Sequence, residues 1–185
     1  MNVYSTLSRN ADALLQRARN ETAIELEDIE AREPLNILVN SLNQDARLNV
    51  EGAKKYEQYL LKILCNRLRM KRDFMAHPEI SEQVIEPPVF LWGMPRTGST
   101  KTQRLLASSE DFNYLTFWQS HNPSLYSGKR CESPQARIDN ADEFCDWFAH
   151  ASPETRYTHA LKSHEPDEES FLIMHSLLSP VFIAF

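Results

Sequence analysis

The sequence has few of the residues that define several large classes of protein. Its 185 residues include only three cysteines and four glycines, and no apolar run reaches the length of a membrane-spanning helix. Three cysteines without a Cys-x-x-Cys spacing do not predict a disulfide framework or a zinc site, so we expect reduced thiols and a cytoplasmic location. A transmembrane helix, which needs about 20 apolar residues, is not predicted.

Net positive charge is also lacking. The chain has 20 basic and 26 acidic residues, which gives a formal net charge of −6. Proteins that bind nucleic acid draw much of their affinity from a basic face, so no nucleic-acid partner is expected. His159 and His175 have no partner at a recognisable metal-ligand spacing, and no metal site is predicted.

Residues 1–86 are poor in helix breakers, with one glycine, Gly52, and two prolines, Pro34 and Pro78. This scarcity predicts an N-terminal helical region. A second helix is expected to begin at Pro34, because proline is favoured in the first turn. A third is expected over about 53–76, with its basic residues on a solvated face or, alternatively, on a face that docks a partner. A first helix is predicted from one apolar face: Leu7, Ala11, Leu14, Leu15 and Ala18.

The character of the chain changes at Pro87 and Pro88. The apolar run 89–92, bounded by prolines and Gly93, predicts a buried strand of a parallel sheet. Residues 87–185 therefore predict an α/β domain with a P-loop-like parallel sheet, following the helical region 1–86. The other expected elements are a helix at 100–108, a weaker strand at 112–118, a helix at 134–150 and a short strand at 159–164.

The turn after residue 92 reads Gly93-Met-Pro-Arg-Thr-Gly98-Ser99-Thr100. Glycines allow the backbone to approach a ligand closely, and amides at a helix N-terminus favour an anion. Ser99 stands where the P-loop of nucleoside triphosphatases has lysine, and the positive charge lies at Arg96 instead. No apolar strand ends in an aspartate that would offer a convincing magnesium ligand, so metal-dependent phosphoryl transfer is disfavoured.

The string GMPRTGST resembles the 5′-phosphosulfate loop of sulfotransferases, which typically reads G-x-P-R-[ST]-G-[ST]-T. The later stretch KSHEPDEESFLIMHSLLSPVF adds a looser resemblance to the bacterial-type branch of that family. The resemblance implies a nucleotide-kinase-like fold, no metal, and 3′-phosphoadenosine 5′-phosphosulfate (PAPS) as the cofactor. Lys101 departs from the family pattern, which usually has an apolar residue there. The cofactor-binding residues that the motif implies are Pro95, Arg96, Thr97, Gly98, Ser99 and Thr100.

Sulfuryl transfer needs a base for the acceptor and positive charge for the leaving phosphate. Arg96 is the candidate for the second role. His164 and Glu165 are the candidate bases, since they lie between an expected strand and a helix start. The alternatives are an exposed loop histidine and an acidic residue that favours the helix N-terminus. His121 is a weaker candidate for the acceptor pocket.

Related sulfotransferases carry a further element, usually an arginine and a serine, that binds the 3′-phosphate. No lysine or arginine follows Lys162, and residues 171–185 are mostly apolar. We therefore expect a truncated or N-terminal portion of a sulfotransferase, with little turnover alone and self-association through 171–185. The acceptor, a small molecule, carbohydrate or lipid, is not readable. The alternatives are a non-catalytic remnant that binds a nucleotide or partner, and a kinase-like phosphate-loop enzyme.

Overall fold

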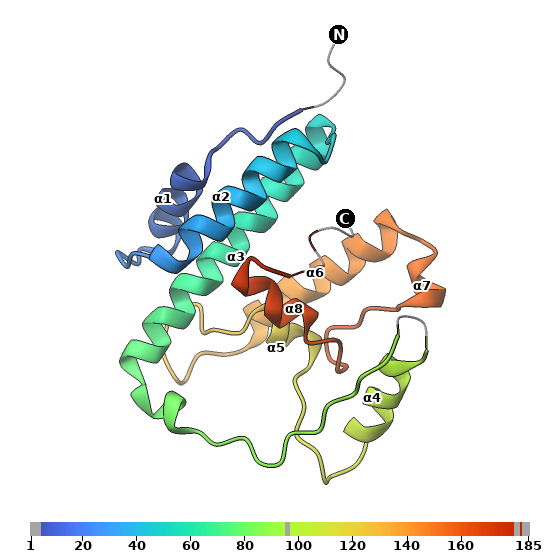
Figure 1. The fold of residues 1–185 in the computed structure, drawn as a ribbon. Coiled ribbons are helices and arrows are strands. Elements are labelled where there is room, and N and C mark those ends of the chain that lie inside the picture. The colour runs from blue at the N-terminus through green and yellow to red at the C-terminus, as the bar shows by residue number, and fades with distance from the viewer. Residues whose placement is uncertain (1–4, 95–96, 180–181, 183–185) are drawn as a thin grey trace. The chain divides into compact units, whose positions relative to one another are not determined.

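The computed structural model describes residues 5–94, 97–179 and 182, and these residues are mainly helical (Figure 1). The chain divides into two compact units. Unit 1 comprises residues 1–77 and 173–185, and unit 2 comprises residues 78–172. Each unit is described by itself.

Three helices form most of unit 1: α1 (Ala11–Thr22), α2 (Ile29–Gln44) and α3 (Val50–Ala76). Asparagines start two of them, because their side chains accept backbone N–H bonds that the first helical turn leaves unpaired. Asn10 accepts from Ala13 at 2.9 Å, and Asn49 accepts from Gly52 at 2.7 Å. Helix α1 packs against both α2 and α3.

The core of unit 1 is aliphatic, and it confirms the predicted apolar faces of the first and third helices. Leu14 and Ala18 of α1 and Leu60 of α3 are fully buried. Burial of a leucine side chain contributes about 1.5–3 kcal/mol, so this packing accounts for much of the stability of the unit. The other members of the predicted first face are also buried: Leu7, Ala11 and Leu15.

The prediction for the second helix was wrong at its start. Helix α2 begins at Ile29, and Pro34 lies inside it. The buried carboxylate of Asp28, the residue before the helix, accepts hydrogen bonds from Arg67 at 2.8 Å and pairs with Lys71 at 2.9 Å. The prediction of a wholly solvated basic face on α3 was therefore also wrong, since these two side chains face a buried partner.

The C-terminal residues return to α3. Asn66 donates to the Nε2 atom of His175 at 3.0 Å, and Arg67 donates to the His175 carbonyl at 2.6 Å. A short 3-10 turn at Met174–Ser176 carries this contact. Most of the described apolar side chains in this segment are buried, whereas Ile173 and Leu178 are exposed; the buried ones are Phe171, Met174, Leu177 and Phe182.

Unit 2 is held by aromatic side chains. Phe117, which begins α5 (Phe117–His121), is fully buried. Its ring stacks on His121 at 5.0 Å and on Phe144 of α6 (Gln135–Ala151) at 5.9 Å, and meets Phe171 edge-on at 4.9 Å. The remaining elements are η1 (Pro78–Glu82), α4 (Ser99–Ala107), α7 (Thr155–Thr158) and α8 (Ser170–Ile173), which ends at the border with unit 1.

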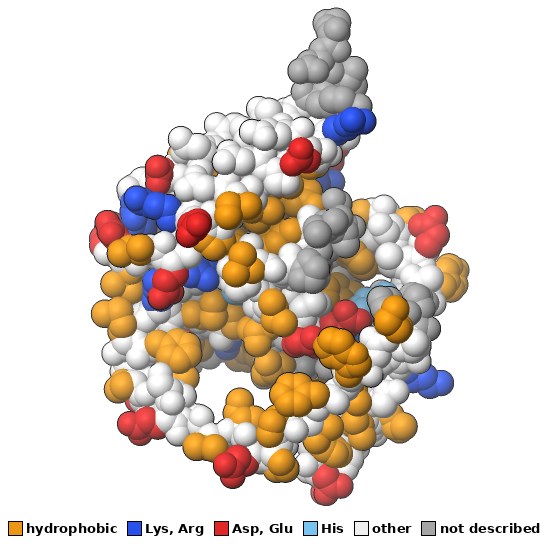
Figure 2. Space-filling model, in the orientation of Figure 1, with side chains coloured by type: hydrophobic (Ala, Val, Ile, Leu, Met, Phe, Trp, Pro, Cys, Tyr) orange, Lys and Arg blue, Asp and Glu red, His pale blue; other side chains and the backbone are white. Residues whose placement is uncertain are grey.

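The predicted buried strand at 89–92 is not present in the structure. This stretch belongs to no helix or strand, and Phe90 is 85% and Trp92 100% exposed. A strand needs neighbours for its N–H and C=O groups, and the described part of unit 2 contains no strand to supply them. Figure 2 shows hydrophobic side chains open to solvent over the region that carries this stretch.

The predictions of the other two strands, at 112–118 and 159–164, were also wrong. Residues 117–121 form helix α5, and residues 159–164 run without a strand. One isolated antiparallel bridge, Thr116 with Pro166, is the only strand-like pairing among the described residues. The parallel sheet expected from sequence is therefore absent from this part of the chain, whereas the helices expected at 100–108 and 134–150 are confirmed.

None of the described helices is both long enough and apolar enough to cross a membrane.

Candidate functional site

The glycine-rich turn is tight at its first glycine. A Cβ atom at Gly93 would lie 2.9 Å from Thr97 Oγ1, closer than such atoms normally approach. The same hydroxyl donates to the Met94 carbonyl at 2.7 Å, which fixes the turn. Pro95 and Arg96, two of the predicted cofactor residues, lie outside the described residues.

The second glycine opens helix α4. Gly98 has φ of 89°, a left-handed conformation that favours glycine, and its carbonyl accepts from the Thr102 amide at 3.0 Å. No side chain caps this end of α4 by a hydrogen bond, and its first turn carries no acidic residue. The first amides of the helix, at Ser99 and Thr100, are therefore available to an anion, which the helix dipole favours.

Hydrogen bonds and an ion pair join helix α4 to the segment 159–167. Gln103 donates to the Asp167 carbonyl at 2.9 Å. Arg104 donates to the Ala160 carbonyl at 3.0 Å and pairs with the Glu165 carboxylate at 2.9 Å. Arg104 lies five residues after Ser99, about 7.5 Å along the helix axis, so these contacts bring a candidate base residue near the glycine-rich turn.

A histidine–aspartate pair, in which only the aspartate is buried, lies beside these contacts. The side chain of Asp167 is 1% exposed, and its Oδ1 atom lies 3.0 Å from His159 Nε2. The hydrogen bond that His159 makes to the Asp167 carboxylate raises the pKa of His159; burial opposes that rise, and the nearby charges of Glu168 and Arg104 add smaller effects. The second carboxylate oxygen, Oδ2, is buried without a hydrogen bond and lies 3.6 Å from Arg104.

The structure separates the two predicted bases. The Glu165 carboxylate pairs with both Arg104 and Lys162. His164 is exposed, and no hydrogen bond or ion pair of its side chain is found among the described residues. The turn that carries it is fixed on its other side, because Phe117 and Trp118 donate their amides to the carbonyls of residues 165 and 163 at 2.9 and 3.0 Å.

His121, the weaker candidate, lies in the aromatic core. It is 3% exposed, and its ring lies 5.0 Å from Phe117 and 4.6 Å from Phe144 between ring centroids. This burial shows that His121 is part of the packed interior of unit 2. An exposed acceptor pocket would need it at the surface.

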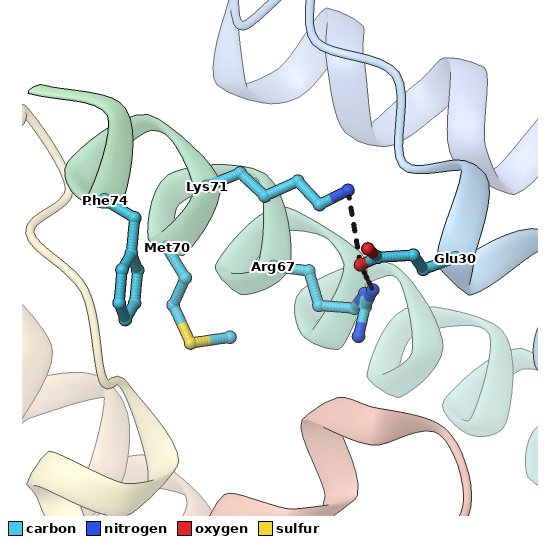
Figure 3. A pocket seen from close by; sticks show the side chains of 5 residues that line it. All are labelled: Glu30, Arg67, Met70, Lys71 and Phe74. Carbon is cyan, nitrogen blue, oxygen red and sulfur yellow. Dashed lines mark ion pairs between the residues drawn. The ribbon is translucent and has the colours of Figure 1, made fainter. Parts of the chain in front are cut away.

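Unit 1 contains a separate charged pocket of about 230 Å³ (Figure 3). Arg67 and Lys71 point toward Glu30, while Met70 and Phe74 form an apolar wall. Glu30 is exposed and its ion pairs are long, at 4.0 Å to Arg67 and 3.6 Å to Lys71. Together with Asp28 it balances both cations, so this pocket has no excess positive charge to attract an anion.

A sequence model described as "Sulfotransferase family" matches residues 87–184, which begin just before the glycine-rich turn and include the segment 159–167. That match covers 98 of the 185 residues. The chain belongs to the sulfotransferase family. The matched region contains the predicted loop residues and both candidate bases of this family member.

A solved structure supports the same fold. The crystal structure of the sulfotransferase STF1 from Mycobacterium tuberculosis H37Rv resembles this chain with a TM-score of 0.69 at 23% sequence identity. The likeness covers 100% of this chain and 50% of STF1, so the chain spans about half the length of that solved sulfotransferase. A search of curated protein sequences found no match.

Sequence reasoning missed Arg104, His159 and Asp167 as neighbours of the site. The sequence places Arg104 in the helix that follows the motif, but it does not predict which residues Arg104 contacts. His159 and Asp167 are eight residues apart in irregular chain, where no periodicity predicts a contact. Only the fold brings these three side chains together.

Proposed function

We propose that this chain carries the phosphosulfate-binding part of a PAPS-dependent sulfotransferase that acts on a hydroxyl or amine acceptor. The observation that carries the proposal is the string GMPRTGST leading into the uncapped N-terminus of α4. The match to the sulfotransferase family over 87–184 supports it. PAPS would supply the sulfuryl group, and adenosine 3′,5′-bisphosphate would leave.

The residues of the glycine-rich string fit such an anion. The amides of Ser99 and Thr100 and their hydroxyls can donate to the oxygens of the 5′-phosphosulfate. The guanidinium of Arg96 would neutralise charge on the leaving phosphate by charge-assisted hydrogen bonds. Gly93 and Gly98 permit the backbone conformation that this contact needs.

We assign the base to His164 rather than Glu165. An imidazole nitrogen of the exposed His164 is open to take the proton of an incoming acceptor. The carboxylate of Glu165 is engaged by Arg104 and Lys162, so it is better suited to holding the turn than to accepting a proton. The acceptor is a small molecule, carbohydrate or lipid.

The sequence offers no clear ligand for the 3′-phosphate end of the cofactor. No lysine or arginine follows Lys162, and two cations of α3, Arg67 and Lys71, pair with Asp28 and Glu30. We therefore propose weak cofactor binding and little turnover by these 185 residues alone, in a cytoplasmic setting. Addition of adenosine 3′,5′-bisphosphate should still shift the amide signals of Ser99 and Thr100 in an NMR titration.

The decisive experiment compares Arg96→Ala with wild type in that titration. Loss of one charge-assisted contact should weaken binding by about 1.5–3 kcal/mol, roughly 10- to 150-fold. Arg130→Ala, an exposed cation outside the loop, is the matched control and should leave binding unchanged. Equal binding by Arg96→Ala and wild type would remove Arg96 from the site.

The same titration separates the alternatives. Shifts caused by ATP with magnesium, but not by adenosine 3′,5′-bisphosphate, would favour the kinase-like enzyme. No response to either ligand would favour a non-catalytic remnant. Where sulfuryl transfer is measurable, we expect it to survive EDTA, because the loop lacks the P-loop lysine and has no evident magnesium ligand.

Self-association through residues 171–185 is a further prediction, now limited by the burial of Phe171, Met174 and Leu177. Among the residues of that segment that the structure describes, Ile173 and Leu178 have exposed apolar side chains. Light scattering should show an assembly that Leu178→Lys weakens. A wild-type monomer would contradict the prediction.

A further inference from the structure

A partly buried cluster of polar side chains lies between α4 and residues 159–167. Arg104, His159 and Asp167 form it, with Gln103 and Glu165 at its edges. Two of its buried atoms, Arg104 Nε and Asp167 Oδ2, have no hydrogen bond. A buried polar group left unpaired is destabilising, so stability alone does not account for this cluster.

The contacts of the cluster instead fix one geometry. The planar guanidinium of Arg104 reaches the Ala160 carbonyl, the Glu165 carboxylate and Asp167, at 3.0, 2.9 and 3.6 Å. Asp167 in turn bonds the Glu168 amide at 2.8 Å, which binds the carboxylate to its own backbone. These contacts lie before and after the turn at 162–165, so the turn cannot shift along α4 without breaking several of them.

The opposite side of that turn is held by backbone groups. The first two amides of α5, at Phe117 and Trp118, donate to the carbonyls of Glu165 and Ser163. The turn is therefore held between two helix segments, with His164 exposed at its apex. Buried ionic groups that specify a single arrangement are a recognised use of such clusters.

We propose that Arg104 and Asp167 are positioning residues, which hold the turn at 162–165, and with it His164, on the helix that begins at the phosphate loop. This inference rests on the proposed function for the role of His164. The coupling between α4 and the turn does not, since it concerns contacts within unit 2. His159 belongs to the same cluster, where it faces Asp167 and Glu168 from its own segment and Arg104 from α4.

The test is amide hydrogen exchange on the full 185-residue chain, read at Phe117 and Trp118, whose amides bond the turn. Arg104→Met and Asp167→Asn should each lower protection at these two amides at least tenfold. Arg130→Met, an exposed arginine outside the cluster, should leave it unchanged. Protection at Phe117 and Trp118 that is the same in all variants would overturn the proposal.

A spectroscopic readout distinguishes positioning from general loosening. In Asp167→Asn, NMR titration should move the His159 imidazole to a lower pKa, and the His164 signals should broaden or shift while the Ser152 amide of α6 keeps its protection. Arg104→Lys keeps the positive charge but lacks the planar set of guanidinium donors. It should therefore restore less than half of the protection that Arg104→Met loses. Full restoration by lysine would show that charge alone acts, against the proposed positioning.

If Arg104→Met proves too unstable to fold, Glu165→Gln decides the question, because its side chain is 34% exposed and its loss removes only one contact of Arg104. It should lower the protection of Phe117 and Trp118 three- to tenfold; no change would overturn the proposal. Failure of adenosine 3′,5′-bisphosphate to bind wild type would count against the proposed function while leaving this coupling intact.

Discussion

The two units differ in how their buried carboxylates are paired and in how much of their chain is exposed. In unit 1 the core is aliphatic, and the buried carboxylates are matched: Asp28 by Arg67 and Lys71, and Glu57 by Ser8 and Arg9. In unit 2 the glycine-rich turn is exposed, and Asp167 keeps one buried oxygen without a hydrogen bond. Binding regions are commonly drawn from the less stable parts of a protein, and unit 2 has these features.

The largest expected effect tests the aliphatic core of unit 1. Leu64 of α3 is 1% exposed, and Leu64→Ala should lower the free energy of unfolding by about 2–5 kcal/mol, because it removes buried surface and leaves a cavity. Leu105 of α4 in unit 2 is 71% exposed, and Leu105→Ala should change it by less than about 0.5 kcal/mol. Urea denaturation of both variants is the measurement. Equal losses would remove the contrast between the units.

The matched charges of unit 1 predict an acid-dependent stability. Burial alone would raise the pKa of Asp28, but hydrogen bonds from Arg67 and Lys71 outweigh it and hold the pKa below the ordinary value of 3.8. The contribution of Asp28 is therefore present above about pH 4 and is lost as the pH falls through the lowered value.

Asp28→Asn should lower the free energy of unfolding at pH 7 by about 1.5–3 kcal/mol, as expected for a hydrogen bond to a charged group. It should also reduce the loss of stability between pH 4 and pH 2, read from urea midpoints across that range. Asp12→Asn, at an exposed position of α1, is the control. A variant with the wild-type acid dependence would show that other carboxylates carry it.

The glycines of the two units differ in what they permit. Gly98 of unit 2 has a positive φ with open space around it, so Gly98→Ala should destabilise the turn by about 1–2 kcal/mol through backbone strain alone. Gly52 of unit 1 lies in a helix, where Gly52→Ala gains up to about 1 kcal/mol of helix propensity against a 3.3 Å contact with Asn49. Denaturation curves that rank the two variants the other way would contradict this difference.

Much of the helical structure was predictable because local patterns determine it. The apolar faces at Leu14 and Leu60 repeat with helical spacing, and the glycine-rich string predicted both a turn at Gly98 and the helix after it. The motif also indicated the sulfotransferase family. The domain boundary predicted at residue 86 stays a prediction.

The strands were not predictable in the same way, because a strand depends on partners that its own sequence does not contain. The apolar run ending at Trp92 has the composition of a buried strand, but no described strand lies beside it. The prediction that α2 begins at Pro34 failed because the helix begins at Ile29, directly after Asp28. Asp28 pairs with Arg67, and a contact between such distant residues cannot be read from the local sequence. The cluster around Asp167 was missed for the same reason.

The smallest expected effect concerns His159 in unit 2. Its contribution to stability is lost as the pH rises, whereas that of Asp28 is lost as the pH falls. The hydrogen bond that His159 donates to the Asp167 carboxylate raises the pKa of His159 above its ordinary value of 6.5, although burial works against it. The stabilisation is therefore complete below about pH 6.5 and is lost as the pH rises through the raised value. Its size should be about 1 kcal/mol, that of one hydrogen bond in a partly exposed pair.

His159→Gln should therefore lower the urea midpoint of unit 2 at pH 5.5 and leave it nearly unchanged at a pH high enough to deprotonate the wild-type His159. The exposed His150→Gln on α6 is the control and should show no such pH difference. Asp28 stabilises unit 1 only at pH values above its lowered pKa. Acid should therefore destabilise unit 1, whereas alkaline pH should destabilise unit 2. A midpoint for His159→Gln that falls equally at both pH values would show that packing of the ring, rather than its charge, holds the segment 159–167.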